Sequence, residues 1–143
     1  MLGIYDDEGI RFEYPPDWEI DVSEDGPRTS VTVQSPSGLA FAMVTIDDTF
    51  PAPEELADEA LAALREEYPT LDAAPASETI DGHNAIGHDI EFLSLDMTNS
   101  CVIRCFSTPR RTVFVLTQWS DLEEDEPEHA LAALRRSLEE TDS

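Results

Sequence analysis

Apolar and charged residues alternate near the start of the chain, and this alternation predicts strands with one buried face. From Phe12 to Val22 the apolar side chains fall on even positions, with charged residues between them. Pro15-Pro16 interrupts the run, and proline cannot donate a ladder hydrogen bond, so the pattern predicts two strands joined by a turn. Gly26-Pro27 predicts the next turn, and a third strand begins near Val31.

Two further patterns predict a central strand and a helix. Residues 39–46 are apolar on both parities, which is typical of a strand covered on both faces. Pro53 then begins a helix at a position where its missing N–H costs nothing, and Pro69 ends it. The apolar stripe of this helix consists of Leu56, Ala57, Ala60, Leu61, Leu64 and Tyr68.

The second half of the chain repeats this order of strands followed by a helix. It predicts a short strand ending near Ile80, a turn at 81–84, strands at 85–95, 101–106 and 112–119, and a closing helix at about 127–140. The fold class is therefore α+β, a mainly antiparallel twisted sheet with two amphipathic helices packed on it. We expect one domain over residues 1–143, with an ordered core from about 9 to 140 and flexible acidic termini.

Charge excludes several classes of partner. The chain contains no lysine, and its 8 arginines stand against 32 Asp and Glu residues, a formal net charge of -24. Such a surface repels nucleic acid and anionic membranes, and it stays soluble in concentrated salt. The first eight residues are acidic where a secretory signal is basic, and no apolar run reaches the ~20 residues of a membrane span. We therefore expect a cytoplasmic protein, adapted to salt or encoded by GC-rich DNA that replaces lysine by arginine.

The segment 81–89 is the best candidate for a metal site, because it offers two imidazoles and two carboxylates. In an extended strand, however, His83 and His88 lie about 16 Å apart. We interpret His88 as a core-facing residue with one hydrogen bond and His83 as a solvent-exposed turn residue. The acidic runs at 6–8, 47–48 and 121–128 lack the ligand spacing of an EF-hand loop. They are interpreted as solvated faces, with a weak cation site or a basic protein partner as the alternatives.

Other side chains with possible chemistry have plain structural interpretations. Cys101 and Cys105 lie about 13 Å apart on a strand, too far for a disulfide or a shared metal, so we expect two buried thiols. Arg104 either has a buried carboxylate partner or covers apolar surface at a sheet edge, and we favour the edge. Trp18 and Trp119 are interpreted as core aromatic residues, with an exposed binding patch for one of them as the alternative. His129 is interpreted as a solvated histidine of the closing helix, with a pH-sensitive contact as the alternative.

No sequence motif indicates catalysis. The chain has no Gly-x-Ser-x-Gly elbow, no glycine-rich phosphate loop and only 6 glycines. We therefore expect a protein that is not an enzyme, with no catalytic, cofactor-binding or metal-binding residues and no cofactor.

The segment Ile10-Arg11-Phe12-Glu13-Tyr14-Pro15-Pro16-Asp17-Trp18 resembles the hydrophobic-x-Tyr-Pro-x-x-Trp opening of Mog1/PsbP-like proteins. The order of predicted elements from about residue 9 to 140 is similar too. The family includes a Ran-binding import factor, extrinsic photosystem II subunits and bacterial adaptors, so the resemblance implies a sandwich fold and a non-catalytic, protein-binding or adaptor module. Its partner is expected to be another protein, not nucleic acid or a membrane. The alternative is a small-ligand or divalent-cation-binding protein that uses surface carboxylates.

Overall fold

The computed structural model describes residues 2–122 and 126–141, which form two sheets and two helices. The small sheet has the order β1-β2-β10, with bounds Gly3–Asp7, Ile10–Tyr14 and Glu139–Glu140. The large sheet has the order β3-β4-β5-β9-β8-β7-β6, and all its neighbouring strands are antiparallel. In chain order its strands are β3 (Glu19–Asp25), β4 (Arg28–Gln34), β5 (Phe41–Asp47), β6 (Asp72–Ile80), β7 (His83–Ser94), β8 (Met97–Ser107) and β9 (Thr112–Ser120). The α+β prediction is confirmed.

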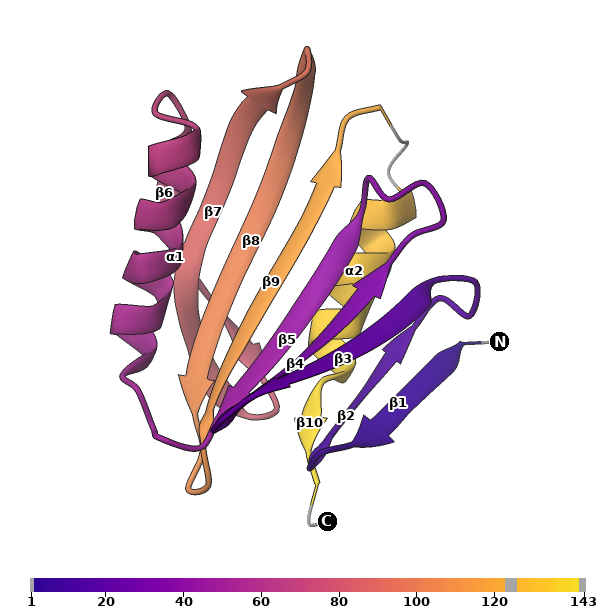
Figure 1. The fold of residues 1–143 in the computed structure, drawn as a ribbon, viewed down its shortest axis with the longest axis vertical. Helices are drawn as coiled ribbons and strands as arrows, with labels where there is room; N and C mark the ends of the chain where they lie inside the picture. The colour runs from indigo at the N-terminus through magenta and orange to yellow at the C-terminus, as the bar shows by residue number, and fades with distance from the viewer. Residues whose placement is uncertain (1, 123–125, 142–143) are drawn as a thin grey trace.

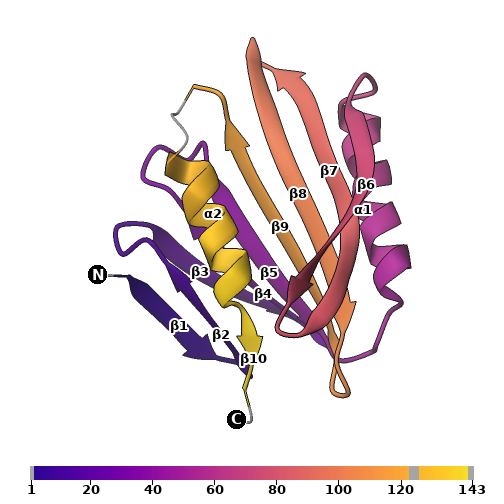
Figure 2. The same ribbon diagram turned by 180° about the vertical axis from the view of Figure 1, so that it is seen from behind.

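Helices cover opposite faces of the large sheet (Figures 1 and 2). Helix α1 (Pro53–Glu67) packs on β7, β8 and β9, while α2 (Glu126–Ser137) packs on β2, β9 and β6. Pro53 begins α1 as predicted, and Glu54 and Glu55 supply the first-turn negative charge that suits the helix dipole. Neither helix in the described ranges combines the length and apolar content that crossing a membrane requires.

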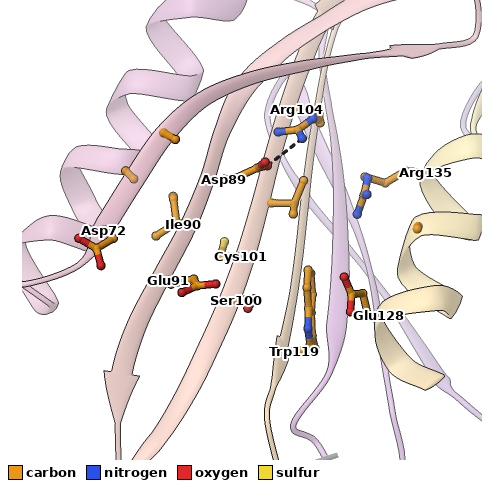
Figure 3. A pocket seen from close by; sticks show the side chains of 14 residues that line it. Asp72, Asp89, Ile90, Glu91, Ser100, Cys101, Arg104, Trp119, Glu128 and Arg135 are labelled. Atoms are coloured by element: carbon orange, nitrogen blue, oxygen red, sulfur yellow. Dashed lines mark hydrogen bonds and ion pairs between the residues drawn. The ribbon is translucent and has the colours of Figure 1, made fainter. Parts of the chain in front are cut away.

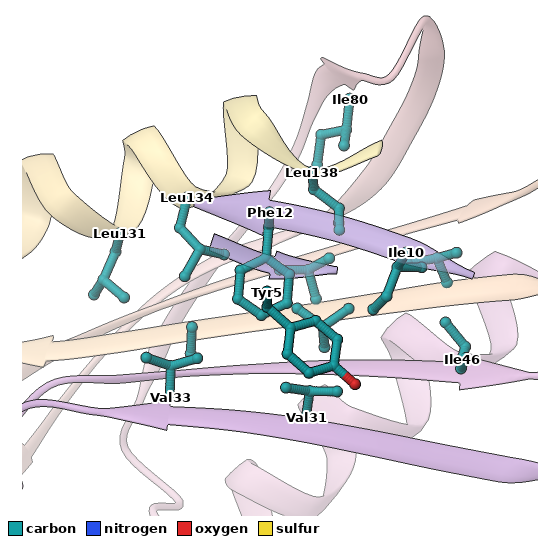
Figure 4. Packing of buried hydrophobic residues seen from close by; sticks show 14 of the residues in the cluster. Tyr5, Ile10, Phe12, Val31, Val33, Ile46, Ile80, Leu131, Leu134 and Leu138 are labelled. Atoms are coloured by element: carbon teal, nitrogen blue, oxygen red, sulfur yellow. The ribbon is translucent and has the colours of Figure 1, made fainter. Parts of the chain in front are cut away.

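Two hydrophobic cores follow from this layering. The first lies between the large sheet and the layer formed by the small sheet and α2 (Figure 4). Its largest fully buried side chains include Phe12 of β2 and Leu131 and Leu134 of α2. The second core lies under α1 and contains Ala57, Leu71, Ile90, Phe92, Cys101, Ile103 and Cys105. Burial of apolar surface in these two cores contributes roughly 25 cal/mol per Å² and holds the large sheet against α1 on one face and against α2 and the small sheet on the other.

Both ends of the chain join the small sheet, which the hydrophobic pattern did not predict. The ordered core was expected to begin near residue 9, but β1 pairs with β2 from Gly3 onward, and Tyr5 stacks on Phe12 with ring centroids 5.2 Å apart. The closing helix was predicted to reach residue 140, but it ends at Ser137 because Glu139 and Glu140 pair with β2 instead. Only Tyr5 of the five residues of β1 is buried, so this segment has too little alternation of apolar and polar residues to indicate a strand.

In the part of the chain that the structure describes, one half of the large sheet is covered mainly on one face. Residues 39–46 were predicted to be buried on both faces, yet the buried apolar side chains of β5, Ala42, Val44 and Ile46, all lie on the side of the small sheet. Phe41 and Met43, on the other side, are half-buried because α1 packs on β7, β8 and β9. Val22 was also expected in the core but is 42% exposed, since β3 is an edge strand.

Candidate binding groove

A groove of about 520 Å³ lies between α2 and strands β6, β7 and β8 (Figure 3). Its floor is set by strand register, because residues directly opposite each other in a sheet share a face. Asp89 lies opposite Val102, and Glu91 lies opposite Ser100. Ser100 in turn lies opposite Trp119 of β9. These side chains therefore project from the same face of the sheet, beside α2.

The floor contains a buried arginine. The Arg104 side chain is only 7% exposed, and its Nε donates to Glu78 Oε1 at 3.0 Å while Nη2 donates to Asp89 Oδ1 at 2.8 Å. A further hydrogen bond of 2.9 Å runs from Nη1 to the carbonyl oxygen of Ile103. The favoured prediction of a sheet-edge arginine is wrong, because β8 lies between β7 and β9. Inside the sheet a guanidinium needs carboxylate partners, and Arg104 has two.

A second arginine joins this network from α2. Arg135 donates from Nε to the same Glu78 Oε1 at 2.8 Å, and from Nη1 to Thr117 Oγ1 at 2.9 Å. Glu78 of β6 therefore connects a strand of the groove floor to the helix that forms its wall. Such a network fixes the angle at which α2 meets the sheet, because charged groups that lose water need close, well-aligned partners.

The rim of the groove is acidic. Asp72, Glu91 and Glu128 are exposed and line it, and in the described part of the chain no arginine or histidine forms an ion pair with them. Figure 3 shows Glu128 beside the ring of Trp119, with Glu91 and then Asp72 successively farther from that ring across the groove. Because Arg104 and Arg135 are already neutralised by Glu78 and Asp89, the groove carries excess negative charge over a partly apolar floor.

The segment 81–89, the candidate metal site, is dispersed by the fold. His88 faces α1, where its Nε2 lies 3.1 Å from Asp58 Oδ1, in agreement with the prediction of one hydrogen bond. His83 is not a solvent-exposed turn residue, because β7 begins there and its ring stacks on Phe106 at 5.0 Å. Among the described residues, no group of three or more His, Cys, Asp or Glu side chains is placed to hold a metal ion.

The acidic runs have different surroundings. Asp47 is buried and accepts hydrogen bonds from Arg28 Nε at 2.8 Å and from Thr49 Oγ1 at 2.6 Å. Burial alone would raise the pKa of Asp47, but the bonds from Thr49 and Arg28 outweigh burial and lower the pKa below its usual value. Asp121 accepts from the Thr98 amide at 3.2 Å, and residues 123–125 of the last run lie outside the described part.

The cysteines are buried and free, as predicted. Burial raises the pKa of both the Cys101 and Cys105 thiols to about 12, so neither supplies a thiolate near neutral pH. Trp18 and Trp119 are half-buried against the first core, so Trp119 serves both that core and the groove. His129 is exposed on α2.

Sequence reasoning missed the groove and its network, although one signal was present. Glu128, Ala132 and Arg135 follow one another at intervals of four and three residues, which places them on one side of a helix. This side of α2 lies next to the apolar stripe of the helix and forms one wall of the groove. No comparable signal marks Glu78, because its two arginine partners lie 26 and 57 residues away in sequence.

Comparison with known proteins shows the fold. No protein-family model and no curated protein sequence matches the chain. Its structure is similar to cyanobacterial PsbP from Synechocystis sp. PCC 6803, with a TM-score of 0.67 and 12% identity over 97% of this chain and 92% of that one. It is also similar to LpqN, involved in cell envelope biogenesis of Mycobacterium tuberculosis, with a TM-score of 0.53 and 14% identity over 99% of this chain and 91% of that one. PA94 of Pseudomonas aeruginosa has a TM-score of 0.56 at 13% identity, over 99% of both chains.

Proposed function

We propose that this chain, which has the Mog1/PsbP-like fold, is a non-catalytic protein-binding module whose groove takes a basic segment of its partner. One observation carries the proposal. The exposed carboxylates of Asp72, Glu91 and Glu128 surround the groove without cationic partners among the described side chains, while the two arginines of the floor are neutralised. Lysine or arginine side chains of another protein complement this arrangement.

The size and lining of the groove agree with a peptide-like occupant. About 520 Å³ accommodates a few side chains, within the range of sites that enclose small ligands. Trp119 and Val102 provide apolar contact in the floor, and Trp is enriched among residues that dominate binding energy. Complementary charge speeds encounter and is weakened by salt, so binding is expected to weaken as ionic strength rises.

The chemistry of the groove supports binding more than catalysis. Cys101, the cysteine next to the groove floor, has its thiol in the core under α1 with a pKa raised to about 12, away from the range where a thiolate attacks substrates. Arg104 and Arg135 are held by fixed partners and form part of the scaffold. The alternative of a divalent-cation site gains no support from the described carboxylates, which do not converge into a ligand set.

Fluorescence titration with a short synthetic peptide of alternating lysine and serine tests the proposal. A net charge of -24 attracts any polycation, so the informative comparison is between two variants of equal charge. D72N/E91Q/E128Q removes three groove carboxylates, and E55Q/E66Q/E67Q removes three exposed carboxylates of α1. The groove variant is expected to weaken binding by about tenfold and the α1 variant by less than about twofold. Equal effects of the two variants would show that binding follows net charge alone and would overturn the proposal.

A further inference from the structure

Three exposed leucines gather at one end of the molecule. Among the described residues, Leu95 is 87% exposed, Leu93 70% and Leu122 68%, the highest values of any large hydrophobic side chain. The hairpin of β7 and β8 that carries the first two extends beyond the neighbouring strands (Figures 1 and 2). We call these three residues the leucine tip. Single exposed leucines are ordinary, but three near one another in so charged a chain indicate an interaction surface.

The leucine tip continues the floor of the groove. Leu93 lies two residues beyond Glu91 on β7, so both side chains project from the same face of the sheet. Leu93 lies opposite Thr98, just as Glu91 lies opposite Ser100. Asp121 holds the segment before Leu122 beside β8, since its amide donates to the Thr98 carbonyl at 2.9 Å.

The backbone of the tip gives an independent reason to expect a function. Leu95 and Asp96 form the two-residue turn between β7 and β8, with φ of 53° and 62°. Hairpin turns with two positive φ values favour Asn or Gly, because a larger side chain crowds the left-handed backbone. Leucine at this position costs backbone strain and leaves an apolar side chain in water, so folding stability does not account for it.

We propose that the leucine tip and the acidic groove form one continuous site for an amphipathic, extended segment of a partner protein. The inference rests on the proposed function and names the partner's chemistry. Glu91 and Leu93 are about 7 Å apart along β7, the spacing of alternate residues in a strand. The segment therefore carries a lysine or arginine over Glu91 and an apolar side chain two residues away over Leu93. An acidic chain repels both an anionic membrane and a second copy of itself, which favours a basic partner over either.

Two synthetic peptides of equal length and charge test the proposal: a lysine–leucine peptide with the repeat Lys-Ser-Leu-Ser and a lysine–serine peptide with the repeat Lys-Ser-Ser-Ser. Only the first carries leucine two residues from each lysine, on the same face of an extended chain. The variant L93S/L95N removes two of the three apolar side chains of the tip, and asparagine suits the left-handed backbone of the turn, so this variant is expected to remain folded. The control is I4S, since Ile4 is 55% exposed on β1 of the small sheet. L93S/L95N is expected to weaken binding of the lysine–leucine peptide by about tenfold and to leave the lysine–serine peptide unchanged. I4S is expected to change neither.

The outcomes separate the two proposals. If D72N/E91Q/E128Q weakens binding of both peptides while L93S/L95N weakens neither, the groove stands and the leucine tip has no role. If the groove variant has no effect either, the proposed function itself fails. Co-sedimentation with phosphatidylcholine vesicles that is lost in L93S/L95N would assign the tip to a membrane and overturn the inference. A dimer in analytical ultracentrifugation that is lost in the same variant would assign the tip to a second copy, with the same consequence.

Discussion

Gly87 on β7 lies directly opposite Arg104 on β8, where the backbone of β8 occupies the space that a side chain of residue 87 would need. A Cβ at residue 87 would lie 1.8 Å from the carbonyl oxygen of Ile103 and 3.2 Å from Cα of Arg104. The absence of a side chain leaves room on this face of the sheet, where the Arg104 guanidinium bonds back to the Ile103 carbonyl. The position of the buried arginine thus depends on a glycine of the neighbouring strand.

Replacing Gly87 by alanine is expected to destabilise the protein strongly. The added Cβ meets backbone, which cannot move aside as a flexible side chain does, so we expect a loss of at least about 2 kcal/mol in urea unfolding. Gly82→Ala provides the contrast, because no atom lies within 4 Å of its Cβ and only its positive φ opposes the substitution. The expected loss there is about 1 kcal/mol. Equal losses at the two positions would show that the close approach of β7 and β8 is not what requires Gly87.

Removing the carboxylate shared by the two arginines is expected to weaken the packing of α2. Glu78→Ala leaves Arg104 without one of its partners and Arg135 without its carboxylate, and we expect a loss of about 2 kcal/mol, moderated because Glu78 is partly exposed. Glu78→Gln keeps an acceptor oxygen and should lose less. The exposed residue Glu66 serves as control, since surface substitutions usually change stability by less than about 0.5 kcal/mol. A value for Glu78→Ala within that range would contradict the structural role of the network.

The stability contribution of Asp47 is expected to disappear in acid. Its native pKa lies below the ordinary value of 3.8, so the folded state binds fewer protons than the unfolded state around that pH. The stabilisation is therefore complete above pH 3.8 and is lost as pH falls through the native pKa. At neutral pH, Asp47→Asn is expected to cost about 1 kcal/mol relative to wild type, and the difference should shrink in acid. Urea unfolding at a series of pH values measures it. Asp48→Asn, at an exposed neighbour, controls for the loss of one negative charge.

Both thiols are expected to resist modification in the native state. A pKa raised from 9.0 to about 12 lowers the thiolate fraction near neutral pH by about a thousandfold, and burial also blocks the reagent. Ellman's reagent should therefore react with Cys101 and Cys105 rapidly in concentrated urea and very slowly without it. Single Cys101→Ala and Cys105→Ala variants assign the reaction to one residue. Rapid native labelling of either thiol would show that its strand opens more readily than the packing under α1 implies.

Sodium chloride is expected to raise the melting temperature smoothly. Screening reduces repulsion among the carboxylates of a chain with a net charge of -24. Calcium, magnesium or zinc should do no more at matched ionic strength. A sharp increase with micromolar amounts of one cation, reversed by a chelator, would instead indicate specific binding to the native state. That result would favour the cation-binding alternative over the protein-binding module.

Local pattern was sufficient for most of the secondary structure and for the class of fold. Alternation predicted the strands because one face of each strand must be buried, and the stripe from Leu56 to Tyr68 predicted α1 for the same reason. The Tyr-Pro motif between Phe12 and Trp18 predicted the Mog1/PsbP-like fold that the structural comparisons show. The burial of both cysteines was also predicted, because their spacing along a strand excludes a disulfide or a shared metal.

By itself, then, the sequence determined most of the residues that face a core, because the periodicity of each strand and helix distinguishes its buried face from its exposed face. The order of strands in the sheet is not recorded in any single strand, and it decided the rest. It placed Arg104 in an interior strand between Glu78 and Asp89, and it separated the residues of the 81–89 segment. It also brought Glu91 of β7, Trp119 of β9 and Glu128 of α2 together, which made an acidic groove out of segments far apart in the chain. Contacts between distant segments depend on the free energy of the whole packed structure, and no local pattern contains that information.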